Sequence, residues 1–142
     1  VWGDPALYDS TLRIVERVRA GGLALDWEVI PGISSVQALA ARHRIPLNRI
    51  GEPVLITTGR KLAEGLPQAP DGVVVMLDGE QAFAKIAPEG LEIFWGAYLG
   101  TPDEILIAGP LAAVSDEIVR IRAAARERHG WIMDIYLLRR CD

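Results

Sequence analysis

Short apolar runs alternate with amphipathic stretches along this chain. Residues 54–57 and 73–77 are apolar runs with the length of a buried strand. Between such runs, apolar residues recur at helical spacing, as in residues 12–20, where Arg and Glu fill the other positions. A continuous apolar run favours a strand that is covered on both faces, and a period near 3.6 residues favours an amphipathic helix. The alternation predicts an α/β fold.

The same pattern assigns the other elements. Gly and Pro residues separate them, Ser34 or Ser35 can cap one helix and Ser115 the longest one, and Gly130 ends that helix. The expected strands are residues 25–30, 54–57, 73–77, 91–99, 104–108 and 131–138, and the expected helices are residues 12–20, 35–43, 60–66, 80–86 and 115–129. Val1 and Trp2 are the end of a further strand, so the first strand, helix and strand predict a parallel sheet.

Tight turns follow several of these strands. In open α/β sheets, ligands bind at the carboxyl ends of the strands, where backbone N–H groups and helix N-termini converge. Each turn alone is ordinary, because Asp4 can cap its own loop or accept hydrogen bonds from a ligand or a neighbouring backbone, and Ser34 and Ser35 are adequate helix caps. Together they predict a ligand site built from Gly3-Asp4-Pro5, residues 31–35, residues 57–60 and Gly109-Pro110-Leu111.

Composition and charge narrow the class of protein. The 142 residues are 50% hydrophobic, which allows a substantial core, and no apolar run approaches the ~18–20 residues that cross a bilayer. The formal charge of −4 comes from dispersed residues and includes no basic stripe, so we expect neither a membrane nor a nucleic-acid partner. Cys141 is the one cysteine, which favours a reducing, cytoplasmic setting. Because Val1 lies inside an expected strand, we expect a piece of a longer protein.

The sequence lacks the residues that several kinds of catalytic site require. A nucleophilic triad needs a histidine beside Ser or Cys, whereas His43 lies within a helix and His129 in the last turn of another. One cysteine and two separated histidines make no zinc pattern, so we expect no metal. The glycine-rich phosphate loops GxGxxG and GxxxxGK(S/T) are both absent. The turns at the strand ends remain as the candidate site.

Three segments resemble the tetrapyrrole methylase family. They are Trp-Gly-Asp-Pro with Leu-Tyr-Asp-Ser-Thr (residues 2–11), Val-Ile-Pro-Gly-Ile-Ser-Ser-Val-Gln-Ala (29–38) and Ile-Pro-Leu-Asn (45–48). Residues 56–60, 108–111 and 130–138 point, within that family, to a member that serves cobalamin biosynthesis. The resemblance runs through all 142 residues and matches only the later part of the family's chain.

The resemblance implies two α/β domains with the methyl donor S-adenosylmethionine bound between them. Residues 1–51 then form the second half of a parallel-sheet, donor-side domain that lacks its first strand and glycine-rich loop, and residues 52–142 form a complete mixed-sheet α/β domain. Trp2 departs from the glycine of many members, and Met76 and Leu77 are alternatives one residue apart. The donor-binding residues implied by position are Trp2, Gly3, Asp4, Pro5, Ser34, Ser35, Met76, Leu77, Ala108, Gly109 and Pro110.

The activity that the resemblance implies is methylation of precorrin-5 at C-1 with release of its acetyl group as acetate. The substrate is a tetrapyrrole polycarboxylate, so Arg60 and Lys61 are candidates to bind it. No residue is assigned as the general acid or base. Family members form homodimers, which implies a homodimer here, and the missing loop implies that this chain alone is inactive. Two alternatives stay open: another tetrapyrrole or diphthine methylase, and a non-catalytic α/β fragment that serves dimerisation.

Overall fold

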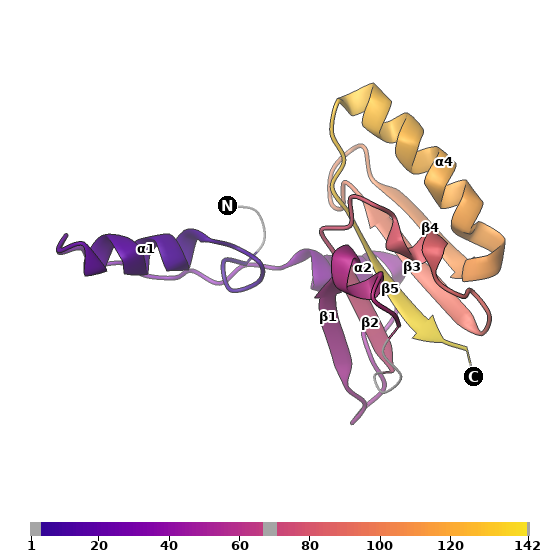
Figure 1. Cartoon of the computed structure of the whole chain (residues 1–142), viewed down its shortest axis with the longest axis horizontal. Helices are drawn as coiled ribbons and strands as arrows, with labels where there is room; N and C mark the ends of the chain where they lie inside the picture. The colour runs from indigo at the N-terminus through magenta and orange to yellow at the C-terminus, as the bar shows by residue number, and fades with distance from the viewer. Residues whose placement is uncertain (1–3, 67–70, 142) are drawn as a thin grey trace.

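The structure, a computed structural model, describes residues 4–66 and 71–141. Its body is a sheet with helices against it, and a slender arm extends from that body (Figure 1). The elements in chain order are α1 (Thr11–Ala20), α2 (Ser35–His43), β1 (Val54–Thr58), α3 (Gly59–Leu62), β2 (Gly72–Met76), the 3₁₀ turn η1 (Ala82–Lys85), β3 (Leu91–Ala97), β4 (Ile105–Pro110), α4 (Leu111–His129) and β5 (Asp134–Arg140).

The sheet has five strands in the order β1-β2-β5-β3-β4. β1 and β2 run parallel, with Val54 opposite Gly72, and the chain crosses between them by way of α3. The other pairings are antiparallel, and β3 and β4 form a hairpin. A parallel pair needs such a crossover and an antiparallel pair does not. The predicted α/β class with a mixed sheet is confirmed.

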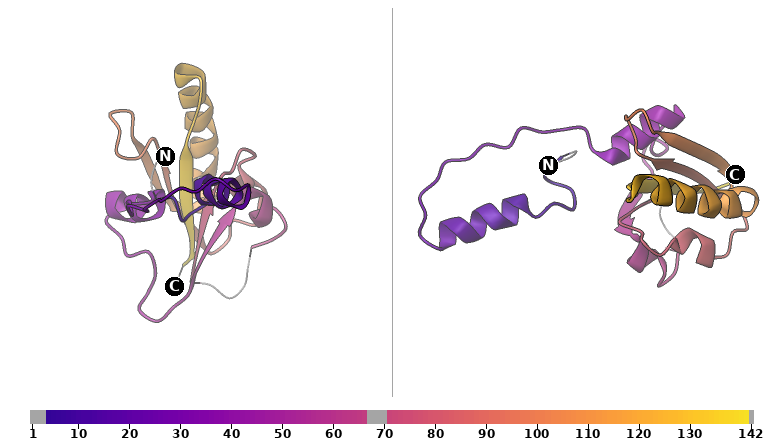
Figure 2. Two further views of the ribbon diagram at one scale, coloured as in Figure 1. Left: turned by 90° about the vertical axis from the view of Figure 1, so that its left-hand side faces the viewer. Right: turned by 90° about the horizontal axis from the view of Figure 1, so that it is seen from above.

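Alternate residues of the central strands face two cores. Val73 and Val75 pack on the side of α3, η1 and α4, whereas Val74 and Leu137 pack on the side of α2. Successive side chains of a strand point to opposite faces, so a strand covered on both faces is apolar throughout. This explains why β2 appears in the sequence as an unbroken apolar run. Figure 2 shows α2 and α4 on different sides of the sheet.

The arm consists of α1 and the extended residues that follow it. It stands clear of the sheet in Figure 1 and in the right-hand view of Figure 2, and no residue of α1 is buried. The predicted strand at residues 25–30 is wrong: these residues form no strand with any other part of the described chain. A strand needs a neighbour's N–H and C=O groups. The neighbour expected for it, Val1 and Trp2, lies outside the described residues.

Several element ends also differ from the predictions. The helix predicted at 60–66 ends at Leu62, before Gly65 with its φ of 133°, and the helix predicted at 80–86 is only the 3₁₀ turn η1. The longest helix begins at Leu111 and not at a Ser115 cap, because β4 passes directly into it at Pro110, whose φ of −54° suits a helix start. The last strand begins at Asp134, three residues later than predicted.

Candidate functional site

A cavity of about 330 Å³ opens at one edge of the sheet. The strand register explains its position: Ala97 at the end of β3 pairs with Asp134 at the start of β5, and Val75 near the end of β2 pairs with Tyr136. Three neighbouring strands therefore end or begin at this edge, and the start of α2 and the loop before α1 close it. The lining residues are Leu7, Tyr8, Asp9, Ile33, Ser35, Ala38, Met76, Leu77, Tyr98, Leu99, Thr101, Trp131, Met133, Asp134 and Ile135.

The lining is largely apolar, with a few polar groups. It includes three aromatic rings and both methionines of the chain, and Ser35 and Thr101 contribute hydroxyl groups. Apolar walls with a small number of polar groups are typical of small-molecule sites, which commonly measure about 300–1,000 Å³. The cavity therefore has the size and chemistry of a site for one small organic ligand.

Backbone strain is concentrated around this cavity. Tyr8, Leu77 and Tyr98 have φ values of 53°, 53° and 51°, and all three line it. They are three of the five non-glycine residues with positive φ in the described segments. The left-handed region costs an ordinary L-residue about 1–2 kcal/mol, and such strain persists mainly where function requires it. The strained backbone thus marks the same edge of the sheet as the cavity does.

Asp4 joins the two turns that the sequence singled out. Its Oδ1 accepts a hydrogen bond from the Ala6 N–H at 2.8 Å, and its Oδ2 accepts one from the Gly32 N–H at 3.0 Å. These donors, that of Gly32 first, hold the pKa of the Asp4 carboxyl below its usual value. Of the roles considered for Asp4, the structure therefore shows two: it caps its own loop through the Ala6 N–H and binds a neighbouring backbone through the Gly32 N–H. Trp2 and Gly3, predicted beside it, lie outside the described residues.

The serine pair at the start of α2 divides into two positions. The Ser34 hydroxyl accepts a hydrogen bond from the Val36 N–H at 3.2 Å and also bonds the Gln37 side chain, so Ser34 is the predicted helix cap. Ser34 is buried, whereas Ser35 lines the cavity. Only Ser35 is placed to meet a ligand there.

The other predicted residues lie in four places. Met76 and Leu77 both line the cavity, so the two alternatives are both at the site. Ala108 pairs with Phe94 and Pro110 with Glu92, which puts this end of β4 toward the opposite edge of the sheet, and neither Gly109 nor its two neighbours line the cavity. Arg60 and Lys61 are exposed on α3, outside the cavity lining, and Lys61 pairs with Glu64 at 3.0 Å. Pro5 does not line the cavity either.

The sequence interpretation missed the wall formed by Tyr98 and Trp131. The Tyr98 hydroxyl donates a hydrogen bond to the Trp131 carbonyl at 2.6 Å, and the two rings meet edge to face at 5.0 Å. Burial raises the pKa of Tyr98 above its usual value, so the phenol stays a hydrogen-bond donor. The turn at Gly100 and Thr101, at the end of an expected strand, was the one sequence signal that pointed here.

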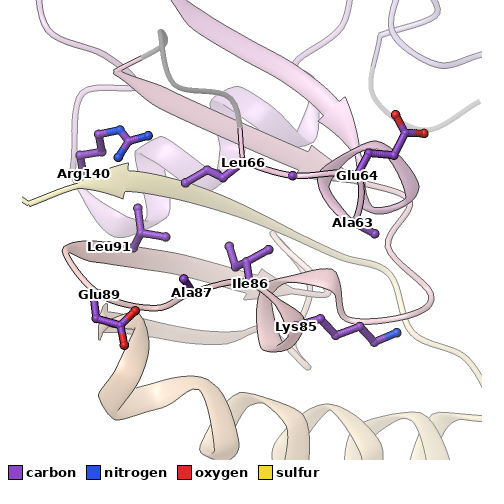
Figure 3. Close-up of a pocket in the computed structure, with 10 residues that line it drawn as sticks. Ala63, Glu64, Leu66, Lys85, Ile86, Ala87, Glu89, Leu91 and Arg140 are labelled. Atoms are coloured by element: carbon purple, nitrogen blue, oxygen red, sulfur yellow. The ribbon is translucent and has the colours of Figure 1, made fainter.

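A second depression, of about 390 Å³, lies at the other edge of the sheet (Figure 3). Leu91, which pairs with Arg140 at the far end of the β3–β5 ladder, lies in its floor with Ile86. Charged side chains surround that floor, among them Lys85 and Glu89. Of the described residues that line it, only Gly65 has a positive φ, which a glycine adopts without strain. The cavity at the strand ends is therefore the better candidate site.

Metal-binding clusters and membrane-spanning helices are both absent from the described segments. Within residues 4–66 and 71–141, no three or more His, Cys, Asp or Glu side chains are grouped so that they could hold a metal ion. No helix in these segments combines the length and apolar character required to cross a bilayer.

The chain is similar to known sequences along nearly its whole length. A sequence model of the tetrapyrrole (corrin/porphyrin) methylases matches residues 1–115. The precorrin-6A synthase (deacetylating) of a Sinorhizobium species is 63% identical over 141 residues, which are 99% of this chain and 54% of that protein. The precorrin-4 C(11)-methyltransferase of Rhodococcus erythropolis is 24% identical over 133 aligned positions, in a match that covers 82% of this chain and 53% of that protein. The chain spans about half the length of these curated relatives.

Solved structures have the same fold. A cobalamin synthesis related protein, CobF, of Corynebacterium diphtheriae is 48% identical and superposes with a TM-score of 0.94, covering 100% of this chain and 60% of that chain. The uroporphyrin-III C-methyltransferase of Thermus thermophilus, solved with S-adenyl homocysteine, is 19% identical with a TM-score of 0.64 and covers 96% of this chain and 62% of that chain. At such low identity the second likeness shows the fold alone.

Proposed function

The chain belongs to the tetrapyrrole (corrin/porphyrin) methylase family, and on that basis we propose that it acts as an S-adenosylmethionine-dependent C-methyltransferase of cobalamin biosynthesis. In this proposal it methylates precorrin-5 at C-1 and the acetyl group leaves as acetate, the activity of a precorrin-6A synthase (deacetylating). The observation that carries the proposal is the 63% identity to a protein of that name along 99% of this chain.

The chemistry of the cavity fits the methyl donor. S-adenosylmethionine combines a flat nucleobase with a positively charged sulfur, and aromatic faces such as those of Tyr8, Tyr98 and Trp131 attract both. Met76 and Met133 are unbranched and can adapt to the shape of a ligand. The hydroxyl groups of Ser35 and Thr101 can bond its polar atoms. We propose that these residues hold the donor.

The chain's own contribution is to position the donor and to exclude water. When bound, S-adenosylmethionine supplies an electrophilic methyl group on its sulfonium. In-line transfer of a methyl group depends mainly on the alignment of the reacting atoms. Asp4 fixes the two turns beside the cavity relative to each other, and Leu77 and Ile33 provide apolar cover. We assign no general acid or base for loss of the acetyl group.

Substrate binding is proposed for the basic residues of α3. Arg60 and Lys61 follow β1, whose last residue Thr58 pairs with Met76. The helix α3 therefore begins at the edge of the sheet that carries the cavity, and both residues are exposed on it. A tetrapyrrole polycarboxylate is attracted by such cations. Ala108, Gly109 and Pro110 lie away from this edge and have no part in the proposal.

We also propose where the protein acts, its oligomeric state and its domain boundaries. We propose a cytoplasmic homodimer that needs no metal, membrane or nucleic acid, with residues 1–51 in the donor-side domain and 52–142 in the second domain. The dispersed charge of −4 supports the absence of a nucleic-acid partner. The exposed apolar side chains of the arm, such as Leu23 and Ile30, support an association surface.

Incubation of the full-length protein with precorrin-5 and S-adenosylmethionine tests the proposed reaction, and the binding measurements use the same full-length protein, because residues 1–142 alone are expected to be inactive. We expect methylated product, S-adenosylhomocysteine and acetate in equal amounts, with no acetate when either reactant is omitted. Methyl transfer without acetate would instead indicate another tetrapyrrole methylase. Failure to bind S-adenosylhomocysteine in a calorimeter would contradict the whole proposal.

A further inference from the structure

A buried polar network lies directly behind the cavity. Arg122 of α4 is 5% exposed and Asp78, which follows Leu77, is 6% exposed. The side chain of Asp134, the first residue of β5, is 6% exposed. Leu77 and Asp134 both line the cavity, so the network lies against two parts of its wall.

Arg122 connects those two parts of the wall. Its Nε donates to Asp134 Oδ2 at 2.9 Å, and one Nη donates to Asp134 Oδ1 at 3.2 Å and to the Asp78 carbonyl at 3.1 Å. The planar guanidinium is suited to this arrangement, because it presents several donors in a fixed geometry. One side chain from α4 thus ties the turn after β2 to the start of β5.

Asp78 completes the tie on the side of β2. Its carboxylate accepts hydrogen bonds from the Glu80 N–H at 3.2 Å, the Ala82 N–H at 2.7 Å and the Tyr136 hydroxyl at 2.5 Å. These bonds fix the turn that holds Leu77 at its positive φ of 53°. On the other side, Trp95 Nε1 donates to Asp134 Oδ2 at 3.0 Å. Both partners of Arg122 are therefore held by further groups of the sheet.

Stability alone is a weak reason for this network. Burying an arginine with a carboxylate costs desolvation, and well-packed apolar residues commonly replace such a pair without loss of stability. An arginine that reaches two strand ends does something that an apolar side chain does not: it sets the distance between them. Strained or fixed residues around a ligand are useful when the site must keep one shape.

We propose that Arg122 is a positioning residue of the cavity, which holds Leu77 and Asp134 at the spacing that the bound ligand requires. The inference deepens the proposed function and rests on it for the identity of the ligand. Arg122 itself does not line the cavity, so it acts through the turn after β2 and the start of β5.

The test compares Arg122→Met, Arg122→Lys and the exposed control Arg120→Met on the same helix. Binding of S-adenosylhomocysteine is measured by calorimetry well below the melting temperature of each variant. We expect Arg122→Met to lose on the order of ten- to a hundredfold in affinity, the scale of a small misplacement in a site. Arg122→Lys keeps the charge and cannot bridge both partners, so it should regain melting temperature but little affinity. Arg120→Met should bind like the unmodified protein.

Hydrogen exchange of the ligand-free protein provides a second readout. In Arg122→Met, the amides of residues 77–82 and 134–136 should exchange faster, while those of β4 should not change. If Arg122→Met does not fold, Tyr136→Phe removes one bond to Asp78 and should show the same two effects more weakly. Affinity equal to that of Arg120→Met, in a folded Arg122→Met or Tyr136→Phe, would overturn the inference while leaving the proposed function intact. If the unmodified protein does not bind S-adenosylhomocysteine, the proposed function is refuted. If, in addition, Arg122→Met leaves the hydrogen exchange of residues 77–82 and 134–136 unchanged, Arg122 does not hold the two strand ends together.

Discussion

Replacement of Gly59 by alanine tests the packing behind the cavity. Gly59 opens α3, and a Cβ built there would lie 2.6 Å from the Cβ of Asp78 and closer still to its carboxyl group. Real Cβ atoms essentially never approach within 3.0 Å. The Asp78 Oδ1, which would lie 2.2 Å from that Cβ, must therefore shift by at least 0.8 Å, the difference between 3.0 and 2.2 Å, and the buried carboxylate has little room to do so.

The magnitude follows from what that shift breaks. Overpacking a core costs about 1–3 kcal/mol, and each weakened hydrogen bond to a charged group up to about 1.5–3 kcal/mol. The carboxylate of Asp78 accepts three such bonds. Alanine gains about 1 kcal/mol over glycine within a helix, which offsets part of this cost. We expect the free energy of unfolding to fall by about 3 kcal/mol.

Urea denaturation of Gly59→Ala beside Gly79→Ala measures this effect. Gly79 adjoins Asp78 in sequence, and a Cβ there would meet no atom within 4 Å, so its substitution should change the free energy of unfolding by less than about 0.5 kcal/mol. Helix propensity alone predicts that Gly59→Ala is the more stable of the two. If Gly59→Ala proves as stable as Gly79→Ala or more so, the described packing of Asp78 is wrong.

Three further predictions concern single side chains. Burial first, and then the Asp78 carboxylate, raise the pKa of Tyr136 above its usual 10.0. The contribution of Tyr136 to stability is therefore complete below about pH 10 and is lost as the pH rises further. Tyr136→Phe should flatten the alkaline limb of a stability-versus-pH curve, and an unchanged limb would refute this. The Arg42 side chain, and then the Gly100 N–H, hold the pKa of Glu104 below its usual 4.5. The contribution of Glu104 to stability is therefore present above that pH and is lost as the pH falls. The stability of Glu104→Gln should be less sensitive to acid in the same titration. Asp4→Ala removes the carboxylate that joins two turns beside the cavity. It should weaken S-adenosylhomocysteine binding on the order of tenfold in calorimetry. Affinity equal to that of the unmodified protein would show that Asp4 has no role in donor binding.

Local sequence signals predicted the elements whose causes are local. Ser34 caps α2 as its position before an amphipathic stretch predicts, and Gly21 ends α1 after Ala20. Most of the apolar run 73–77 became β2, an interior strand of the sheet, because both faces of the sheet are covered. The strand predicted at residues 25–30 failed because a strand depends on a neighbour, which periodicity does not show.

The sequence identified part of the cavity: Ser35 belongs to one of the predicted turns, and Met76 and Leu77 were implied by the family resemblance. Met76 and Leu77 line the cavity because parallel strands bring their carboxyl ends to one edge. Ala108 to Pro110 also follow a strand, but β4 is antiparallel to β3, so its end lies toward the opposite edge. Tyr98 and Trp131 meet in the cavity through the register of β3 with β5, and such long-range register has no local signal in the sequence.

Filling the cavity tests most directly whether it is the site of the methyl donor. Ala38 is half-buried on α2 and lines the cavity, and Ala113 is exposed on α4 and does not. Calorimetric titration of S-adenosylhomocysteine should show that Ala38→Phe loses about a hundredfold or more in affinity, because the added ring occupies the ligand's volume, while Ala113→Phe stays within about twofold of the unmodified protein. If folded Ala38→Phe binds S-adenosylhomocysteine as tightly as Ala113→Phe, the donor does not bind in this cavity.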